Sequence, residues 1–283
     1  MSKCFSHRGM IIRGIPSDLK KSNYKQMKSH SLLYLILCFL TFSACSEQHS
    51  GPDPRLNQPE DFKKLLDAHG DWAKWISARS FSFAMVHETT LEWENHYLDL
   101  QTGKVRIDAD LYQAGNDGEK VWVSPNRQSF PGQSVRFYHN LYSTFLSIPY
   151  VLTDTTVTVT KIPNRVFNGI SFETLEAKVK NGALIGPSDR YTLLIDPETG
   201  RLAWVLFSVK FFDRNNQIEE ALYYEDYRDA NGLVFPRVIT GYQTENDSSR
   251  RIRYQTSFSD VFLVEKSLEK DLFEMPKTGV TTN

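Results

Sequence analysis

The stretch "RYTLLIDPETGRLAWVLFSVKFF" (190–212) contains the clearest β-hairpin signal in the chain. Asp196-Pro197 begins its turn and Gly200 ends it, at a position where a positive φ is needed. The arm after the turn, residues 202–212, is apolar on both faces, which is typical of a central strand that is covered on both sides. The hairpin therefore predicts a domain built mainly of β-sheet.

Strand-like segments rich in β-branched and aromatic residues continue on both sides of this hairpin. The segments before it are "FSFAMVHE" (81–88), "LEWENHYLDLQ" (91–101), "KVRIDADLY" (104–112), "EKVWVS" (119–124), "TTVTVTKI" (155–162) and "ISFETLEAKV" (170–179). The segments after it are "IEEALYYEDYRD" (218–229), "LVFPRVITGYQ" (233–243) and "RIRYQTSFSDVFLV" (251–264). Short turns predict antiparallel pairing, because a parallel crossover needs about a dozen residues or more. Pro236 interrupts one strand pattern, which predicts a sheet edge or a bulge there.

Helical patterns flank and interrupt the strands. Residues 59–76 carry apolar side chains at steps of three and four, although Gly70 weakens or breaks that helix. Residues 134–148 repeat the pattern up to Pro149 and are apolar on most sides, which is typical of a helix that is buried or covers a cavity. A short helix is expected near residues 268–273. The regular spacing of strands and turns favours one sheet domain of ten to eleven strands, curved or closed.

Composition and motifs exclude several classes of function. The chain has 33 basic and 34 acidic residues and a net charge of −1, so no basic field favours nucleic acid as a partner. Its cysteines are Cys4, Cys38 and Cys45, so the body has no disulfide, thiolate metal site or cysteine nucleophile. His87 and Glu88 point to opposite faces of an extended strand, so we expect no metal site. With no recognised catalytic motif, we expect neither an enzyme nor a cofactor.

Residues 28–45 have the features of a secretory signal. Lys28 precedes an apolar run at 32–42, and the small residues Ser43 and Ala44 come directly before Cys45. The run is shorter than the ~20 residues of a spanning helix, and a single transmembrane anchor is the alternative interpretation. Met27 already starts a complete signal, so residues 1–26 are an expected upstream extension without a folded part.

The tetrapeptide Phe42-Ser43-Ala44-Cys45 resembles the lipobox of bacterial lipoproteins, with Phe42 where leucine is usual. The resemblance implies cleavage before Cys45 and attachment of lipid to that cysteine. Several acyl chains together hold a protein on a bilayer, whereas one chain does so only marginally. Ser46 follows the cysteine, and by the enterobacterial sorting rule this favours the outer membrane of the cell envelope.

The chain is therefore divided into five expected parts. Residues 1–26 are the extension, 27–44 the lipoprotein signal peptide, 45–59 a tether, 60–275 the folded domain and 276–283 a tail.

The order of elements resembles the outer-membrane lipoprotein carrier (LolA-like) superfamily, and most nearly a family of bacterial cell-envelope lipoproteins of unknown activity. The stretches that carry the resemblance are "HYLDLQTGKVRI", "VWVSP", "RFYHNLYSTFLSIPYVLTD", "DRYTLLIDPETGRLAWVLF" and "DYRDANGLVFP", together with Ala68-His69-Gly70 and Trp72. The resemblance implies a strongly curved antiparallel sheet, a half-barrel whose concave face is covered by helices. It brings no catalytic residues to this chain. The soluble carrier of that superfamily has no anchor, so a stationary role fits this chain better than a shuttling one.

The expected function is that of a membrane-anchored, non-catalytic lipoprotein that binds an acyl chain or a lipoprotein in the half-barrel. Candidate cavity-lining residues are Trp122, Phe137, Tyr138, Tyr142, Phe145, Trp204 and Phe207. The first alternative is a structural or interaction lipoprotein whose core is filled by these same aromatic side chains. The second is an envelope hydrolase, which clustering of His96, His139 or Asp189 with a nucleophile would support.

Overall fold

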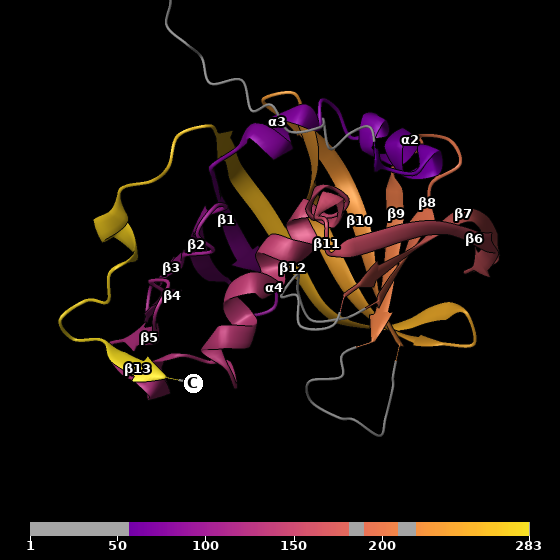
Figure 1. Ribbon diagram of the computed structural model, residues 1–283. Coiled ribbons are helices and arrows are strands. Elements are labelled where there is room, and N and C mark those ends of the chain that lie inside the picture. Colours follow the sequence, from indigo (N-terminus) through magenta and orange to yellow (C-terminus); the bar gives the residue numbers. More distant parts are fainter. Residues whose placement is uncertain (1–56, 181–189, 209–218, 283) are drawn as a thin grey trace, which may run out of the picture. The chain divides into compact units, whose positions relative to one another are not determined.

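The computed structural model describes residues 57–180, 190–208 and 219–282. In this part of the chain, thirteen strands form one antiparallel sheet that has two edges and is not closed into a barrel (Figure 1). The strand order across the sheet is β13-β5-β4-β3-β2-β1-β12-β11-β10-β9-β8-β7-β6. Consecutive strands are neighbours almost throughout, as short turns predict.

The strands are β1 (Ser80–His87), β2 (Glu92–Asp99), β3 (Val105–Ala109), β4 (Gln113–Asn116), β5 (Val121–Ser124), β6 (Val157–Phe167), β7 (Ile170–Val179), β8 (Arg190–Ile195), β9 (Leu202–Ser208), β10 (Glu219–Ala230), β11 (Leu233–Glu245), β12 (Ser248–Val264) and β13 (Val280–Thr282). The helices are α2 (Glu60–Ala68), α3 (Ala73–Ser77) and α4 (Val135–Ser147), with short 3₁₀ turns η2 (Arg127–Ser129), η3 (Tyr150–Thr153) and η4 (Lys270–Phe273).

The mainly-β class is confirmed, but there are thirteen strands instead of the ten to eleven expected. The two that sequence patterns miss are β4, which is short and glycine-containing, and β13, which lies in the stretch expected as a tail. Gly115 of β4 pairs with Trp122, and a Cβ at Gly115 would lie 2.6 Å from an indole carbon of Trp122. Because glycine has no side chain, it adds nothing to the alternation of apolar and polar residues that marks a strand. The sequence of β4 therefore reads as a turn.

The hairpin at the centre of the sequence forms β8 and β9 as predicted. Leu194 pairs with Trp204, and Gly200 ends the turn with a φ of 70°. Residues 202–207 of β9 are all buried, so both faces of this strand are covered.

Helix α4 defines two faces of the sheet. It contacts β3, β4 and β5 and also β11, which lies well across the sheet, so the sheet bends around the helix (Figure 1). We call the face toward α4 the inner face and the opposite one the outer face. The main core joins the inner face to α2, α3 and α4; among its fully buried large side chains are Phe62, Leu66, Phe81, Met85, Phe145, Tyr150, Tyr191 and Phe235.

A smaller cluster of buried side chains covers part of the outer face; it comprises Phe167, Phe172, Leu194, Ala203, Trp204, Leu206 and Ala221. The tip of the β6–β7 hairpin closes this outer cluster. Arg165 donates two hydrogen bonds to Glu219, of 3.0 and 2.8 Å, and two to Asp247, of 2.9 and 2.6 Å. The tip of an edge hairpin is thus fastened to the turn between β11 and β12, several strands away.

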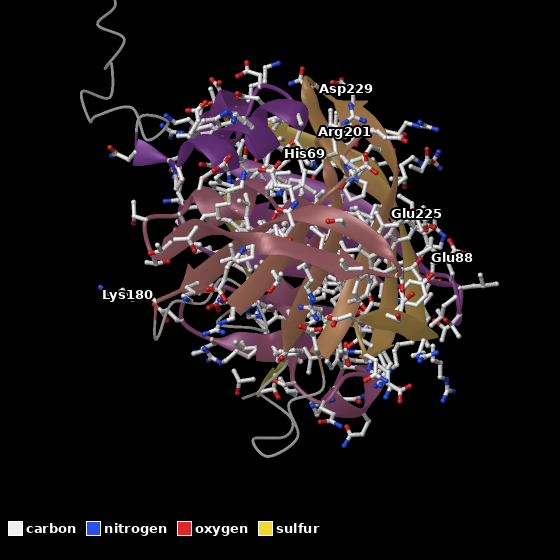
Figure 2. All side chains as sticks on the ribbon, turned by 90° about the vertical axis from the view of Figure 1, so that its right-hand side faces the viewer. His69, Glu88, Lys180, Arg201, Glu225 and Asp229 are labelled. Atoms are coloured by element: carbon white, nitrogen blue, oxygen red, sulfur yellow. The ribbon has the colours of Figure 1, made fainter. Side chains whose placement is uncertain are left out.

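The end of α2 meets the sheet at Gly70, where a break was predicted. Gly70 has a φ of 105° and forms a β-bridge with Leu233, and a Cβ at Gly70 would overlap a backbone oxygen. His69 and Arg201 lie together at this end of the sheet (Figure 2), and the Arg201 guanidinium donates to the carbonyl of Ala68 at 3.1 Å. Among the described residues, no helix combines the length and the apolarity needed to cross a membrane.

Candidate functional site

Helix α4 begins at a capped end and lies directly on the inner face. The Ser134 hydroxyl accepts a hydrogen bond from the backbone N–H of Phe137 at 3.3 Å, as at many helix N-termini. Farther along, the Tyr224 hydroxyl of β10 donates to the carbonyl of Phe145 at 2.9 Å. The helix predicted over residues 134–148 is confirmed, and it is attached to the sheet by polar contacts as well as by apolar packing.

A buried carboxylate ties the first half of α4 to β2. Glu94 is 1% exposed and accepts hydrogen bonds from the hydroxyls of Tyr112 and Tyr138, each at 2.6 Å. The Nε2 atoms of His96 and His87 also lie within hydrogen-bond distance of its oxygens, at 2.7 and 3.2 Å. We call these five residues the Glu94 cluster. Tyr138 is its only member on α4 among the described residues.

The Glu94 cluster keeps its carboxylate charged. Burial alone would raise the pKa of Glu94, but hydrogen bonds from His87, His96 and Tyr112 and the charge interaction with His96 together hold that pKa well below its usual range. Burial and the nearby negative charge raise the pKa values of Tyr112 and Tyr138, so both stay protonated donors. The arrangement is chemically suited to fixing α4 in place.

Sequence patterns missed this cluster because its central residue is a glutamate in an ordinary alternating strand. The register was the missing information: Met85 pairs with Glu94 and Phe83 with His96, which puts the carboxylate and the imidazole on the inner face. In the sequence the acidic neighbour of His87 is Glu88. In the structure the acidic partner of His87 is Glu94, on the adjacent strand. Among the described residues, no group of three or more histidine, cysteine or acidic side chains could hold a metal ion.

A cavity lies between α4 and the ends of β1, β2 and β3, with a volume of about 210 Å³. We call it the α4 cavity. Its wall on the sheet side includes the apolar side chains of Phe81, Leu98 and Val105, and also the charged residues Asp99 and Lys104. Its wall on the helix side is formed by small residues, among them Ser143 and Ser147. Small helix side chains opposite large apolar strand side chains leave this space unfilled.

The predicted lining residues lie in different parts of the fold. Tyr142, Phe145 and Phe207 belong to the main core, and Tyr138 packs against it. The rings of Phe145 and Phe207 are 5.2 Å apart between centroids. These residues therefore come together on the inner face, while the α4 cavity is lined by neighbours of theirs.

The other predicted lining residues lie elsewhere. Trp204 belongs to the outer cluster. Trp122 is fully buried on β5 and donates from Nε1 to the carbonyl of Phe273 at 3.2 Å. Phe137 is half-buried on α4. Strand phase alone could have separated Trp122 from Val121 and Val123, whose side chains point to the inner face.

From the sequence, clustering of His96 or His139 with a nucleophile would indicate a hydrolase. Among the described residues, neither is hydrogen-bonded to a serine, threonine or cysteine side chain. His96 bonds to Glu94. His139 is buried on α4, and its Nδ1 has no hydrogen-bond partner among the described residues. Asp189 and Cys45 lie outside the described residues.

Comparisons with known proteins give similarity at the level of structure. No protein-family model matches the chain, and no curated protein is significantly similar to it in sequence. An outer-membrane lipoprotein-sorting protein domain from Vibrio parahaemolyticus is 11% identical, with a TM-score of 0.42 over 75% of this chain and 97% of that one.

Two further solved structures match over similar lengths. A DUF1329 family protein from Desulfovibrio piger is 12% identical, with a TM-score of 0.45 over 79% of this chain and 98% of that one. A LolA superfamily protein from Nitrosomonas europaea is 10% identical, with a TM-score of 0.43 over 75% of this chain and 96% of that one. These three matches are similarities of fold.

Proposed function

We propose that this protein is a non-catalytic lipoprotein of the bacterial envelope, anchored through Cys45, that binds a lipophilic ligand on the inner face beneath α4. The observation that carries the proposal is the α4 cavity, an unfilled space of about 210 Å³ whose sheet wall includes the apolar side chains of Phe81, Leu98 and Val105. An acyl chain is the ligand class, because such a wall offers contact without hydrogen bonds. Burying hydrocarbon gains about 0.8 kcal/mol per methylene group.

The volume of the cavity implies that α4 moves when a ligand enters. Pockets that hold small molecules are typically about 300–1,000 Å³, which exceeds the α4 cavity. Tyr138 and Phe145 are the points at which the helix is hydrogen-bonded to the sheet. In this proposal the helix is a cover over the concave inner face, and these two contacts oppose its opening.

Native mass spectrometry of residues 46–283 tests the proposal, followed by organic extraction and lipid analysis. We expect a stoichiometric lipid, and we expect Ser143→Phe to remove it because the larger side chain fills the α4 cavity. The matched control is Arg136→Phe, which adds the same ring on the exposed side of the same helix. Loss of the lipid in both variants, or in neither, would contradict a site under α4.

A structural or interaction lipoprotein is the second candidate, and a specific observation favours it. Tyr142, Phe145 and Phe207 are buried in the main core, and the rings of Phe145 and Phe207 are in contact. Much of the inner face is therefore filled by the protein's own side chains. An empty protein that also takes up no fluorescent fatty acid would establish this alternative and direct the search to protein partners.

A further inference from the structure

The sheet opens between β11 and β12. These strands pair only from Val238 to Glu245 on β11, opposite Ser257 to Ser248 on β12. Beyond Val238 and Ser257, residues 233–237 and 258–264 diverge below α3 (Figure 1) and border a cavity of about 530 Å³. We call this cavity the sheet gap. Its volume lies in the range of about 300–1,000 Å³ that is usual for small-molecule sites.

Each of the two strands contains a feature that prevents closure of the gap. Pro236 has no backbone N–H to give to β12. The N–H of Val234 is already used, because it lies 2.8 Å from the carbonyl of His69 and 2.9 Å from the hydroxyl of Tyr150. On β12, Asp260 has a φ of 50° next to a register shift against β1, which bends the strand. Pro236 was expected at a sheet edge or a bulge; it lies instead in the interior strand β11, beyond the point where pairing with β12 ends.

The gap is suited to a hydrocarbon chain, which needs no hydrogen bonds, and not to a peptide strand. An added peptide strand would require backbone partners on both walls, and the β11 wall has lost them at Val234 and Pro236. The remaining wall is largely apolar. Phe262 is 60% exposed at the surface, whereas Phe235 and Phe258 are each 2% exposed, so the gap has apolar side chains both at the surface and in the core.

The gap is lined by charged side chains of both signs, the cationic Arg228 and Arg237 and the acidic Asp229 and Asp260. The guanidinium groups of Arg228 and Arg237 both contact Asp226, at 2.6 and 3.5 Å. A guanidinium can bind a phosphate oxygen while keeping part of its contact to a carboxylate, since it has five N–H donors. A phosphate-containing head group therefore suits these two arginines.

The gap ends against the wall of the α4 cavity. Phe235 lines the sheet gap and Phe81 lines the α4 cavity, and their rings stack with centroids 5.7 Å apart. Each space therefore has one member of this stacked aromatic pair in its wall.

We propose that the sheet gap is where an acyl chain of a membrane glycerophospholipid enters this protein, with its phosphate at Arg228 and Arg237 and its chain directed toward Phe235. The inference rests on the proposed function, which it extends by giving the ligand class and its route. Phe81 and Phe235 then form the gate through which the chain reaches the α4 cavity.

Photo-crosslinking of the full chain tests this route. The protein is incubated with vesicles of phosphatidylethanolamine and phosphatidylglycerol, in which a small fraction of the phosphatidylglycerol carries a diazirine near the end of one acyl chain. We expect adducts on peptides that contain residues 233–237 and 258–264. Ser259→Trp places an indole in the gap and should reduce these adducts on the order of tenfold.

Matched variants separate a blocked gap from a damaged fold. Ser257→Trp is the control, because Ser257 lies two residues away on the same strand but still pairs with Val238. Val264→Trp is a second blocking variant at a site that is 46% exposed and tolerant of a larger side chain. Both blocking variants should lose adducts, while the control keeps them.

The outcomes distinguish this route from the proposed function. Adducts confined to residues around Ser143 and Trp75 would overturn the gap and leave ligand binding under α4 intact. Adducts at the gap that neither blocking variant reduces would also overturn it. Labelling no stronger than that of an unrelated soluble protein would reject both proposals.

Discussion

Glu94 is the residue whose removal should matter most for stability. Its carboxylate is almost fully buried, so removing it leaves two tyrosine hydroxyls and two imidazoles without their shared acceptor. Breaking a buried pair in this way costs about 3–5 kcal/mol. We expect Glu94→Ala to lower the free energy of unfolding by that amount in urea denaturation. Glu92→Ala, on the exposed part of the same strand, should change it by about 0.5 kcal/mol or less.

The same variant reports whether the cluster fixes α4. Hydrogen exchange of α4 amides should quicken in Glu94→Ala more than in the Glu92 control, because Tyr138 loses its partner on β2. Equal unfolding free energies for the two variants would show that the cluster contributes nothing to holding the helix.

His139 should make the protein sensitive to mild acid. Burial, and then the nearby Arg136 charge, lower the pKa of His139 from 6.5 to about 4. Between these two values the unfolded chain binds a proton that the folded chain does not, so stability falls as pH falls from 6.5 to 4. The full loss for one such group is roughly 3 kcal/mol. His69, with a pKa lowered to about 4 mainly by burial, adds a second contribution of the same sign.

The variant His139→Phe isolates this effect. It removes a titrating group and an unpaired Nδ1 while keeping a ring of similar size. We expect the dependence of unfolding free energy on pH between 6.5 and 4 to weaken by one proton, measured by urea denaturation at a series of pH values. An unchanged slope would mean that His139 is protonated in the folded state.

At the scale of elements, the tip of the β6–β7 hairpin is held by Arg165 and by hydrogen bonds of Asn168 to Asp247 and Ser249. The Arg165 guanidinium contacts Glu219 and Asp247 and is partly exposed, so its loss should cost only about 1 kcal/mol. The clearer result is local: Arg165→Ala should speed hydrogen exchange in residues 166–172 and expose Phe167. Lys161→Ala is the control, since Lys161 also forms ion pairs, with Glu173 on this hairpin and Asp61 on α2, but lies away from the tip. If both variants exchange alike, the tip is held by its other contacts.

Elements with strong local signals could be predicted from the sequence, and those set by distant contacts could not. The β8–β9 hairpin and α4 depend on turn chemistry and helical period, which a short window contains. Strand β13 consists of three residues and exists because it pairs with β5, so nothing in its own sequence specifies it. The Glu94 cluster and the sheet gap likewise depend on register and on divergence of strands. Pro236 was the one local sign of the gap.

At the scale of the whole molecule, the N-terminal extension should be dispensable. Met27 begins a complete signal, so a chain lacking residues 1–26 should be exported as efficiently as the full chain. Cell fractionation measures this as the share of each protein found outside the cytoplasm. Failure of the shortened chain to leave the cytoplasm would show that the extension takes part in targeting.

Anchoring decides what the inner face and the sheet gap can encounter. A protein held at a bilayer by several acyl chains meets membrane lipid at high local concentration, whereas a released domain does not. We expect Cys45→Ser to abolish incorporation of labelled palmitate and to move the protein from the membrane to the soluble fraction. Cys38→Ser is the matched control, because Cys38 lies in the apolar run that cleavage removes, and it should leave both readouts unchanged. Membrane retention of Cys45→Ser without label would instead indicate an uncleaved apolar anchor, and both variants would then behave alike.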